Sequence, residues 1–373
     1  MNKKPMCVAP FENILIDAYK RVKPCPVFKP KTNLTIENYF NSDEIREIQT
    51  AHLLNKSLPD QCSVCARNES NFGGSLRDSK QVVYDHRVYN VGEFFLESIL
   101  IQTSNACNLK CMPCDYASFP RLKELVELKF IPQGSDIGLI KFDSNAFSSL
   151  VEIIEKYKVA NVLILGGEPF YDKVTFEFVD ELIKSGLSKN LTLHFTTNLT
   201  NINNKKVENI KKTFKDFILD CSVDGVGLVN EYLRYPSKWK EILSGIKILN
   251  DLDQRFNIRT AFSNLVLLKY PELILWALEN NLGNLYLCSV DNPEIMNPHR
   301  LPIGLQDEIN KKYEKLQNLK VDIVTKQSIV AATGYAANLD ETDFNKSLEF
   351  FKKHDTHRGT NLLEVFPELK PYV

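Results

Sequence analysis

Three cysteines stand close together in the chain, in the run CNLKCMPC that begins at Cys107, includes Cys111 and ends at Cys114. The C-x3-C-x2-C spacing places three thiolates on one short loop, whereas an iron–sulfur cluster commonly takes four. A [4Fe–4S] cluster held here would keep one iron open for a small ligand. A zinc site is the alternative, although structural zinc takes four ligands and no histidine follows this loop closely.

A glycine-rich turn comes next, at Gly166, Gly167, Glu168 and Pro169, directly after an apolar run over 161–165. Glycines let the backbone come close to a ligand. The Glu168 carboxylate can accept a charge-assisted hydrogen bond from a ligand ammonium group. The alternative is an ordinary turn between a strand and a helix.

Short polar residues follow the next two apolar runs, and an arginine lies ten residues beyond the last of them: Thr197, Asn198, Ser222, Asp224 and Arg234. Such side chains suit a ribose and a carboxylate, and an arginine can pair with an acidic group. The alternatives are helix caps for the short residues and a surface position for the arginine.

Four further cysteines precede this region, at Cys7, Cys25, Cys62 and Cys65. Four thiolates would saturate either a [4Fe–4S] cluster or a tetrahedral zinc ion, and spacing alone leaves both open. Cys221 and Cys288 lie within apolar strands, so we expect them to be small core residues.

The elements that must position these residues alternate between strands and helices. The apolar runs predict strands at 96–103, 161–165, 192–196, 217–223, 259–265 and 285–290. Amphipathic runs predict helices at 145–157, 174–185, 205–214, 237–251 and 271–280. Six β-then-α units imply a parallel sheet with right-handed crossovers, two units short of an eight-fold barrel. We predict an α/β fold built on a partial (β/α)6 TIM-like barrel.

The cysteine content and the pattern of predicted elements change along the chain and predict three domains. Residues 1–90 form a cysteine-rich module, with a hairpin at 14–16 and 21–23, a helix at 36–54 and a loop at 60–80. Residues 91–300 form the barrel, and residues 301–373 form a helical C-terminal extension.

The balance of charge and the length of the apolar runs limit the classes of function that the chain could have. The 373 residues carry 46 basic and 47 acidic side chains, so no whole-chain field favours nucleic acid or an acidic membrane. The first residues show no signal peptide, and no apolar run is long enough to span a bilayer. We expect a cytoplasmic protein whose cysteines stay reduced, so their spacing indicates metal ligation.

The pair CNLKCMPC and GGEP resembles the radical S-adenosylmethionine (SAM) superfamily. The resemblance implies that Cys107, Cys111 and Cys114 hold a [4Fe–4S] cluster to which SAM binds. It also implies that the 166–168 segment contacts the SAM amino group. The chain departs from the family at Pro113, where an aromatic residue is common, with Tyr116 nearby.

The N-terminal cysteines resemble the twitch/SPASM auxiliary-cluster module, here placed before the barrel. The residues that carry this likeness are the four cysteines together with Tyr39, Glu69, Gly73 or Gly74, Ser75 and Arg77. The tail is also similar to the end of twitch-type proteins, through Asp355, Arg358, Gly359, Asn361 and Phe366 to Glu368. The resemblance implies that the four cysteines hold a second, auxiliary [4Fe–4S] cluster.

The activity implied is reductive cleavage of SAM to a 5′-deoxyadenosyl radical, which abstracts hydrogen from a substrate. The electron donor would be a flavodoxin or a ferredoxin. The auxiliary cluster would accept an electron from the substrate or ligate it, or would only support the fold. The sequence does not identify the substrate; the resemblance implies a peptide or protein side chain, or alternatively a small sugar, nucleoside or cofactor precursor. A zinc-stabilised binding protein without catalysis is the alternative of a different class.

Overall fold

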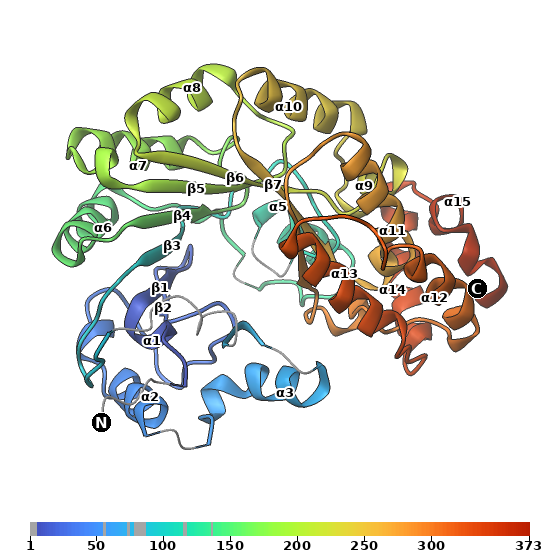
Figure 1. Ribbon diagram of the computed structural model, residues 1–373, viewed down its shortest axis with the longest axis horizontal. Coiled ribbons are helices and arrows are strands. Elements are labelled where there is room, and N and C mark those ends of the chain that lie inside the picture. The colour runs from blue at the N-terminus through green and yellow to red at the C-terminus, as the bar shows by residue number, and fades with distance from the viewer. Residues whose placement is uncertain (1–5, 55–56, 73–74, 78–86, 115–117, 136) are drawn as a thin grey trace. The chain divides into compact units, whose positions relative to one another are not determined.

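The computed structural model describes the chain except residues 1–5, 55–56, 73–74, 78–86, 115–117 and 136 (Figure 1). The strands form one sheet in the order β2-β1-β3-β4-β5-β6-β7-β8. Their bounds are β1 Asn13–Ile16, β2 Val22–Lys23, β3 Ser98–Gln102, β4 Asn161–Leu165, β5 Thr192–Thr197, β6 Asp216–Ser222, β7 Phe256–Phe262 and β8 Leu285–Ser289. Helices separate consecutive strands from β3 to β8, which confirms the partial (β/α)6 barrel.

The chain forms two compact units, and the first comprises Met1–Asn105, Ile140–Phe195 and Ile210–Phe217. Its helices are α1 Ala9–Glu12, α2 Asp43–Leu53, α3 Ser63–Phe72, α6 Ser144–Tyr157 and α7 Lys173–Lys184. β1 pairs in parallel with β3, β3 with β4 and β4 with β5, while β2 pairs antiparallel with β1. The N-terminal hairpin therefore extends the barrel sheet, and α1 lies between this hairpin and α2 (Figure 1).

The second unit comprises Ala106–Leu139, Thr196–Asn209 and Ile218–Val373. In it β6, β7 and β8 pair in parallel. Its helices are α5 Phe119–Glu127, α9 Leu228–Leu233, α10 Trp239–Asp251, α11 Asn264–Glu279, α12 Gln306–Glu314, α13 Ile323–Ala336, α14 Phe344–Arg358 and α15 Leu362–Val365. The helix α8, Asn204–Thr213, contributes to both units. The predicted helical extension after residue 300 corresponds to α12 through α15.

Several predicted elements recur nearly unchanged, such as β4, α6 and the hairpin. The predicted strand at 259–265 is displaced, because β7 ends at Phe262 and Ser263 caps α11 by accepting a hydrogen bond from the Val266 amide at 3.4 Å. The predicted helix at 271–280 consequently begins seven residues too late. The apolar residues that follow Ser263 are buried on a helix, and such a run cannot be told from a buried strand by periodicity alone.

Three other predictions need correction. The loop at 60–80 is wrong over Asp60–Phe72, which forms a 3-10 turn and α3, while residues 73–74 and 78–80 lie outside the described residues. Among the described side chains of α3, only Val64 and Cys65 are buried. Two buried positions are too few to show the helical periodicity in the sequence. The helix at 36–54 begins only at Asp43. Cys221 is buried as predicted, but Cys288 is exposed on β8, the last strand of the sheet.

No helix within the described ranges is both long and apolar enough to cross a membrane.

The close approach of Gly283, just before β8, to the start of β7 yields a stability prediction. A Cβ added there would lie 2.0 Å from the Phe256 carbonyl oxygen, so Gly283→Ala should lower the free energy of unfolding by about 1–3 kcal/mol. Gly334→Ala is the control, because its Cβ in α13 meets open space and should stabilise the helix by about 0.5–1 kcal/mol. Chemical denaturation of both variants would measure the difference, and equal stabilities would contradict the close approach.

Candidate metal centres

The three-cysteine loop follows β3 and lies in the second unit. None of the nine cysteines, all of which the structure describes, forms a disulfide, and Cys107, Cys111 and Cys114 are each partly exposed. The Leu109 amide donates to the Cys107 sulfur at 3.4 Å. Burial by surrounding protein raises the pKa of Cys111 to about 12. A thiolate at this position therefore needs a compensating cation, which is what a bound metal supplies.

The backbone of this loop is held by α9 and the residues that follow it. The Met112 amide donates to the Leu233 carbonyl at 2.8 Å, and the Lys110 amide donates to the Tyr235 carbonyl at 2.6 Å. Both amides belong to residues next to Cys111. The loop is thus fixed by hydrogen bonds to residues more than a hundred positions later in the chain.

Asn198, predicted as a SAM contact, is also tied to the loop. Its amide nitrogen donates to Asn108 at 2.9 Å, and the amide nitrogen of Asn108 donates to the Thr200 hydroxyl at 2.8 Å. The Thr200 hydroxyl donates to the oxygen of Asn198 at 2.7 Å. Sequence reasoning missed Asn108 and Thr200, since neither stands out without knowledge of the partner. A contact between Asn198 and SAM stays a prediction.

Arg234 and Asp224, predicted as separate contacts, form one buried ion pair. The guanidinium meets both carboxylate oxygens at 2.7 and 2.9 Å, and Asp224 also accepts a hydrogen bond from the Ala261 amide at 2.8 Å. Arg234 is only 8% exposed, which excludes the surface position. Burial has the largest effect on the pKa of Cys111, and the positive charge of Arg234 has the next largest, in the opposite direction. The ion pair of Arg234 and Asp224 therefore lies near Cys111.

The remaining predicted polar residues of the second unit are buried. The Thr197 hydroxyl accepts a hydrogen bond from the Leu199 amide at 3.2 Å, which is a local turn contact. Ser222 ends β6 with 9% of its surface exposed.

The glycine-rich turn lies in the first unit, between β4 and α7. The Gly167 amide donates to the Ser104 carbonyl at 3.2 Å. The Glu168 carboxylate is 1% exposed and accepts a hydrogen bond from the Phe170 amide at 3.1 Å, and Pro169 is buried beside it. Glu168 therefore stabilises its own turn, whatever it binds in addition.

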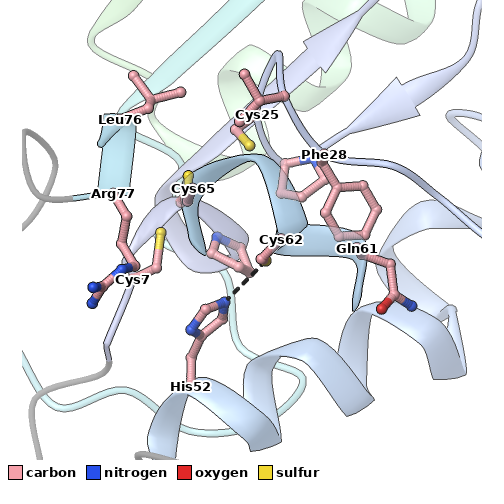
Figure 2. A pocket seen from close by; sticks show the side chains of 13 residues that line it. Cys7, Cys25, Phe28, His52, Gln61, Cys62, Cys65, Leu76 and Arg77 are labelled. Carbon is pink, nitrogen blue, oxygen red and sulfur yellow. Dashed lines mark hydrogen bonds between the residues drawn. The ribbon is translucent and has the colours of Figure 1, made fainter. Parts of the chain in front are cut away.

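The N-terminal cysteines gather around one cavity in the first unit, and Figure 2 shows their sulfur atoms around the same space. The cavity is lined by Cys7, Cys25, Cys62 and Cys65, which come from three separate segments of the module. Burial raises the pKa of Cys7 and of Cys62 to about 12, and the neighbouring thiols add to this rise. The structure thus brings together all four residues that the sequence grouped.

His52 and Arg77 also line this cavity. The Nε2 atom of His52 lies 3.7 Å from the Cys62 sulfur (Figure 2), and burial lowers the pKa of His52 to about 4, so the ring is neutral at pH 7. Arg77 donates to both oxygens of Glu69 at 2.8 and 2.6 Å, and Ser75 donates to Glu69 at 2.6 Å. Sequence reasoning missed His52, which stands alone on α2. Gly73, Gly74 and Tyr116 lie outside the described residues.

Among the residues that the structure describes, no three His, Cys, Asp or Glu side chains converge on the position of a single metal ion.

Comparison with known proteins finds one matching family model. Residues 101–270, which include the three-cysteine loop and the glycine-rich turn, match the model of the radical SAM superfamily. This similarity covers 170 of the 373 residues, which is less than half of the chain. Proteins of this superfamily are enzymes that use a [4Fe–4S] cluster and SAM, so the match supports an enzyme over the non-catalytic zinc protein. No curated protein matches the chain.

Several solved structures resemble the chain at low identity. Native anSMEcpe with bound AdoMet is 19% identical, with a TM-score of 0.44 over 59% of this chain and 61% of that chain. Streptococcus suis SuiB bound to the precursor peptide SuiA is 16% identical, with a TM-score of 0.40 over 83% and 64%. HydG, a maturase of the [FeFe]-hydrogenase, is 13% identical, with a TM-score of 0.35 over 81% and 60%. The chain spans less than two thirds of the length of each.

Iron content tests both cysteine sets. Anaerobically reconstituted protein should hold about eight irons, and the Cys107→Ala, Cys111→Ala, Cys114→Ala variant should hold about half, because each full set binds about four. Iron and zinc would be measured together by mass spectrometry. Stoichiometric zinc without iron uptake would contradict the cluster assignment.

Glu168 gives a second prediction for this site. Glu168→Gln keeps an oxygen that can accept from the Phe170 amide but loses the charge, so the turn should survive. A charge-assisted hydrogen bond contributes about 1.5–3 kcal/mol, so we expect SAM affinity to fall by roughly tenfold or more. Calorimetric titration of iron-loaded protein would measure it. Unchanged affinity would limit Glu168 to capping its turn.

Proposed function

We propose that this protein is a two-cluster radical SAM enzyme. Cys107, Cys111 and Cys114 would hold the [4Fe–4S] cluster that binds SAM. A second [4Fe–4S] cluster would be held by Cys7, Cys25, Cys62 and Cys65. The observation that carries the proposal is the loop of residues 107–114, whose three thiols stand on a backbone that other elements hold in place, within the part of the chain that matches the family.

The residues that we propose for SAM binding come from both units. The backbone of Gly166 and Gly167 and the carboxylate of Glu168 would hold the SAM ammonium group. The buried polar residues of the second unit, Thr197, Asn198, Ser222, Asp224 and Arg234, would face the rest of the molecule. Arg234 already forms an ion pair with Asp224. The two side chains would therefore contact SAM as a pair without net charge, and Arg234 would not act as an unpaired cation.

When bound, the cluster and SAM supply reductive cleavage of SAM and a 5′-deoxyadenosyl radical that abstracts hydrogen from the substrate. The chain holds and orients both groups, and no side-chain base is required for this first step. A flavodoxin or ferredoxin would deliver the electron.

The four-thiol cavity supports electron transfer rather than substrate ligation at the second cluster. Four thiolates can occupy all four irons, which leaves no open iron for a substrate. Besides the four cysteines, the described residues that line the cavity are apolar except for His52, Gln61 and Arg77. When bound, this cluster would supply an acceptor for one electron, giving net oxidation of the substrate.

The resemblance to auxiliary-cluster enzymes favours a peptide or protein side chain as the substrate. Incubation of the reconstituted enzyme with candidate peptides, with mass loss of two hydrogens as the readout, would test this class directly. Turnover of sugars or nucleosides alone would overturn it.

A pair of variants separates the two clusters. Cys62→Ala, Cys65→Ala should still cleave SAM, because the SAM cluster takes its thiols from the 107–114 loop, but product formation on the physiological substrate should fail. The assay compares 5′-deoxyadenosine with product in iron-loaded protein. Cys288→Ala, outside both sets, is the control and should keep both activities. Full product turnover in the double variant would rule out electron transfer through the second cluster.

A further inference from the structure

A charge cluster with almost no solvent exposure lies in the second unit, between α5 and α14. It comprises Arg121, Glu124 and Arg358, whose side chains are exposed by 1% or less. Glu124 accepts from Arg358 at 2.8 and 2.6 Å and from Arg121 at 2.5 Å. His354 completes the set, with its Nε2 2.6 Å from Arg121 and its Nδ1 2.7 Å from the Phe350 carbonyl.

Both arginines reach the three-cysteine loop. Arg358 donates to the Lys110 carbonyl at 2.5 Å, and Arg121 donates to the Met112 carbonyl at 3.2 Å. These carbonyls belong to the residues on either side of Cys111, whose amides already donate to Leu233 and Tyr235. The two residues that flank the central cysteine are therefore each held at both their amide and their carbonyl.

The end of α14 is shaped to present Arg358. Gly359 adopts a left-handed conformation with φ +66° directly after it. Asp355 then accepts from the Thr360 hydroxyl and the Leu362 amide, both at 2.7 Å, which fixes the turn into α15. The Arg358 guanidinium also lies 4.9 Å from the centre of the Tyr235 ring. The tail motif of the sequence, Asp355 to Asn361, thus fixes the turn at the end of α14 from which Arg358 reaches the loop.

The cluster carries an excess of positive charge. Two guanidinium groups face one carboxylate, and their hydrogen bonds and charge outweigh its burial and lower the pKa of Glu124 to about 2. Burial and the two arginines lower the pKa of His354 to about 3, so the ring is neutral at pH 7. Among the described residues, Arg121 Nε and Arg358 Nη1 are buried without a hydrogen-bond partner. A net buried charge is costly unless an anion compensates it.

We infer that Arg121, Glu124 and Arg358 are positioning residues for the SAM-cluster loop, and that their net positive charge raises the reduction potential of the cluster held there. The inference rests on the proposed function for the cluster itself. The thiolates of Cys107, Cys111 and Cys114 would be the compensating anions. Hydrogen bonds and net charge near an iron–sulfur cluster are established means by which proteins set its potential.

Two variants with opposite charge changes test this. Arg358→Gln removes one positive charge and Glu124→Gln removes the negative one. We expect the reduction equilibrium to become about tenfold less favourable in the first, which is about 59 mV more negative for one electron, and to shift in the opposite direction in the second. The readout is an EPR-monitored redox titration of the signal that changes on SAM addition. Arg358→Lys should restore most of the wild-type potential.

Lys353→Gln is the matched control, because it removes the same charge from an exposed position on the same helix and should not shift the potential. Equal or same-direction shifts in Arg358→Gln and Glu124→Gln would overturn the inference, since loss of a merely structural brace gives no opposite signs. If Arg358→Gln holds no iron, Glu124→Gln decides alone, and no shift or a negative one overturns the inference. Failure of the wild-type protein to bind iron would instead refute the proposed function.

Discussion

The three-cysteine loop depends on hydrogen bonds that come from far along the chain. Residues 106–114 form no helix or strand, so individual hydrogen bonds rather than a regular element fix the direction of the thiols. Amides of the loop donate to the last residue of α9 and to Tyr235 just after it, and its carbonyls accept from α5 and α14. The contact from Arg121 to the Met112 carbonyl is buried, so its loss would leave an unsatisfied polar group, which costs about 1–3 kcal/mol. The geometry of the loop is therefore a property of the second unit as a whole.

In the N-terminal module the thiols are brought together by the packing of separate segments rather than on one loop. Its four cysteines come from separate segments, and the cavity that they share brings together the start of α1, the hairpin, the 3-10 turn at Asp60–Cys62 and α3. A small apolar cluster of Val8, Phe11 and Tyr89 supports α1. Thiols with a raised pKa at the centre remain protonated without a metal, so metal binding there would release protons and contribute to folding.

Sequence reasoning recovered the barrel and the grouping of the cysteines, because both have strong local signatures. Alternating apolar and amphipathic runs placed β4 and α6 within one residue, and cysteine spacing grouped the thiols that line the N-terminal cavity. It failed where a pattern was ambiguous, as in the buried residues after Ser263, which fit a strand or a helix equally well. Pairings across the chain, such as Arg234 with Asp224 or Arg358 with Glu124, leave no trace in a single sequence.

The claim that both cysteine sets hold iron can be tested by crystallography of the anaerobically reconstituted protein with SAM. Anomalous scattering would be measured on both sides of the iron edge and of the zinc edge. The account predicts iron at two positions, one bound by Cys107, Cys111 and Cys114 together with SAM, and one bound by Cys7, Cys25, Cys62 and Cys65. Zinc at the N-terminal position, or no iron at the three-cysteine loop, would contradict it.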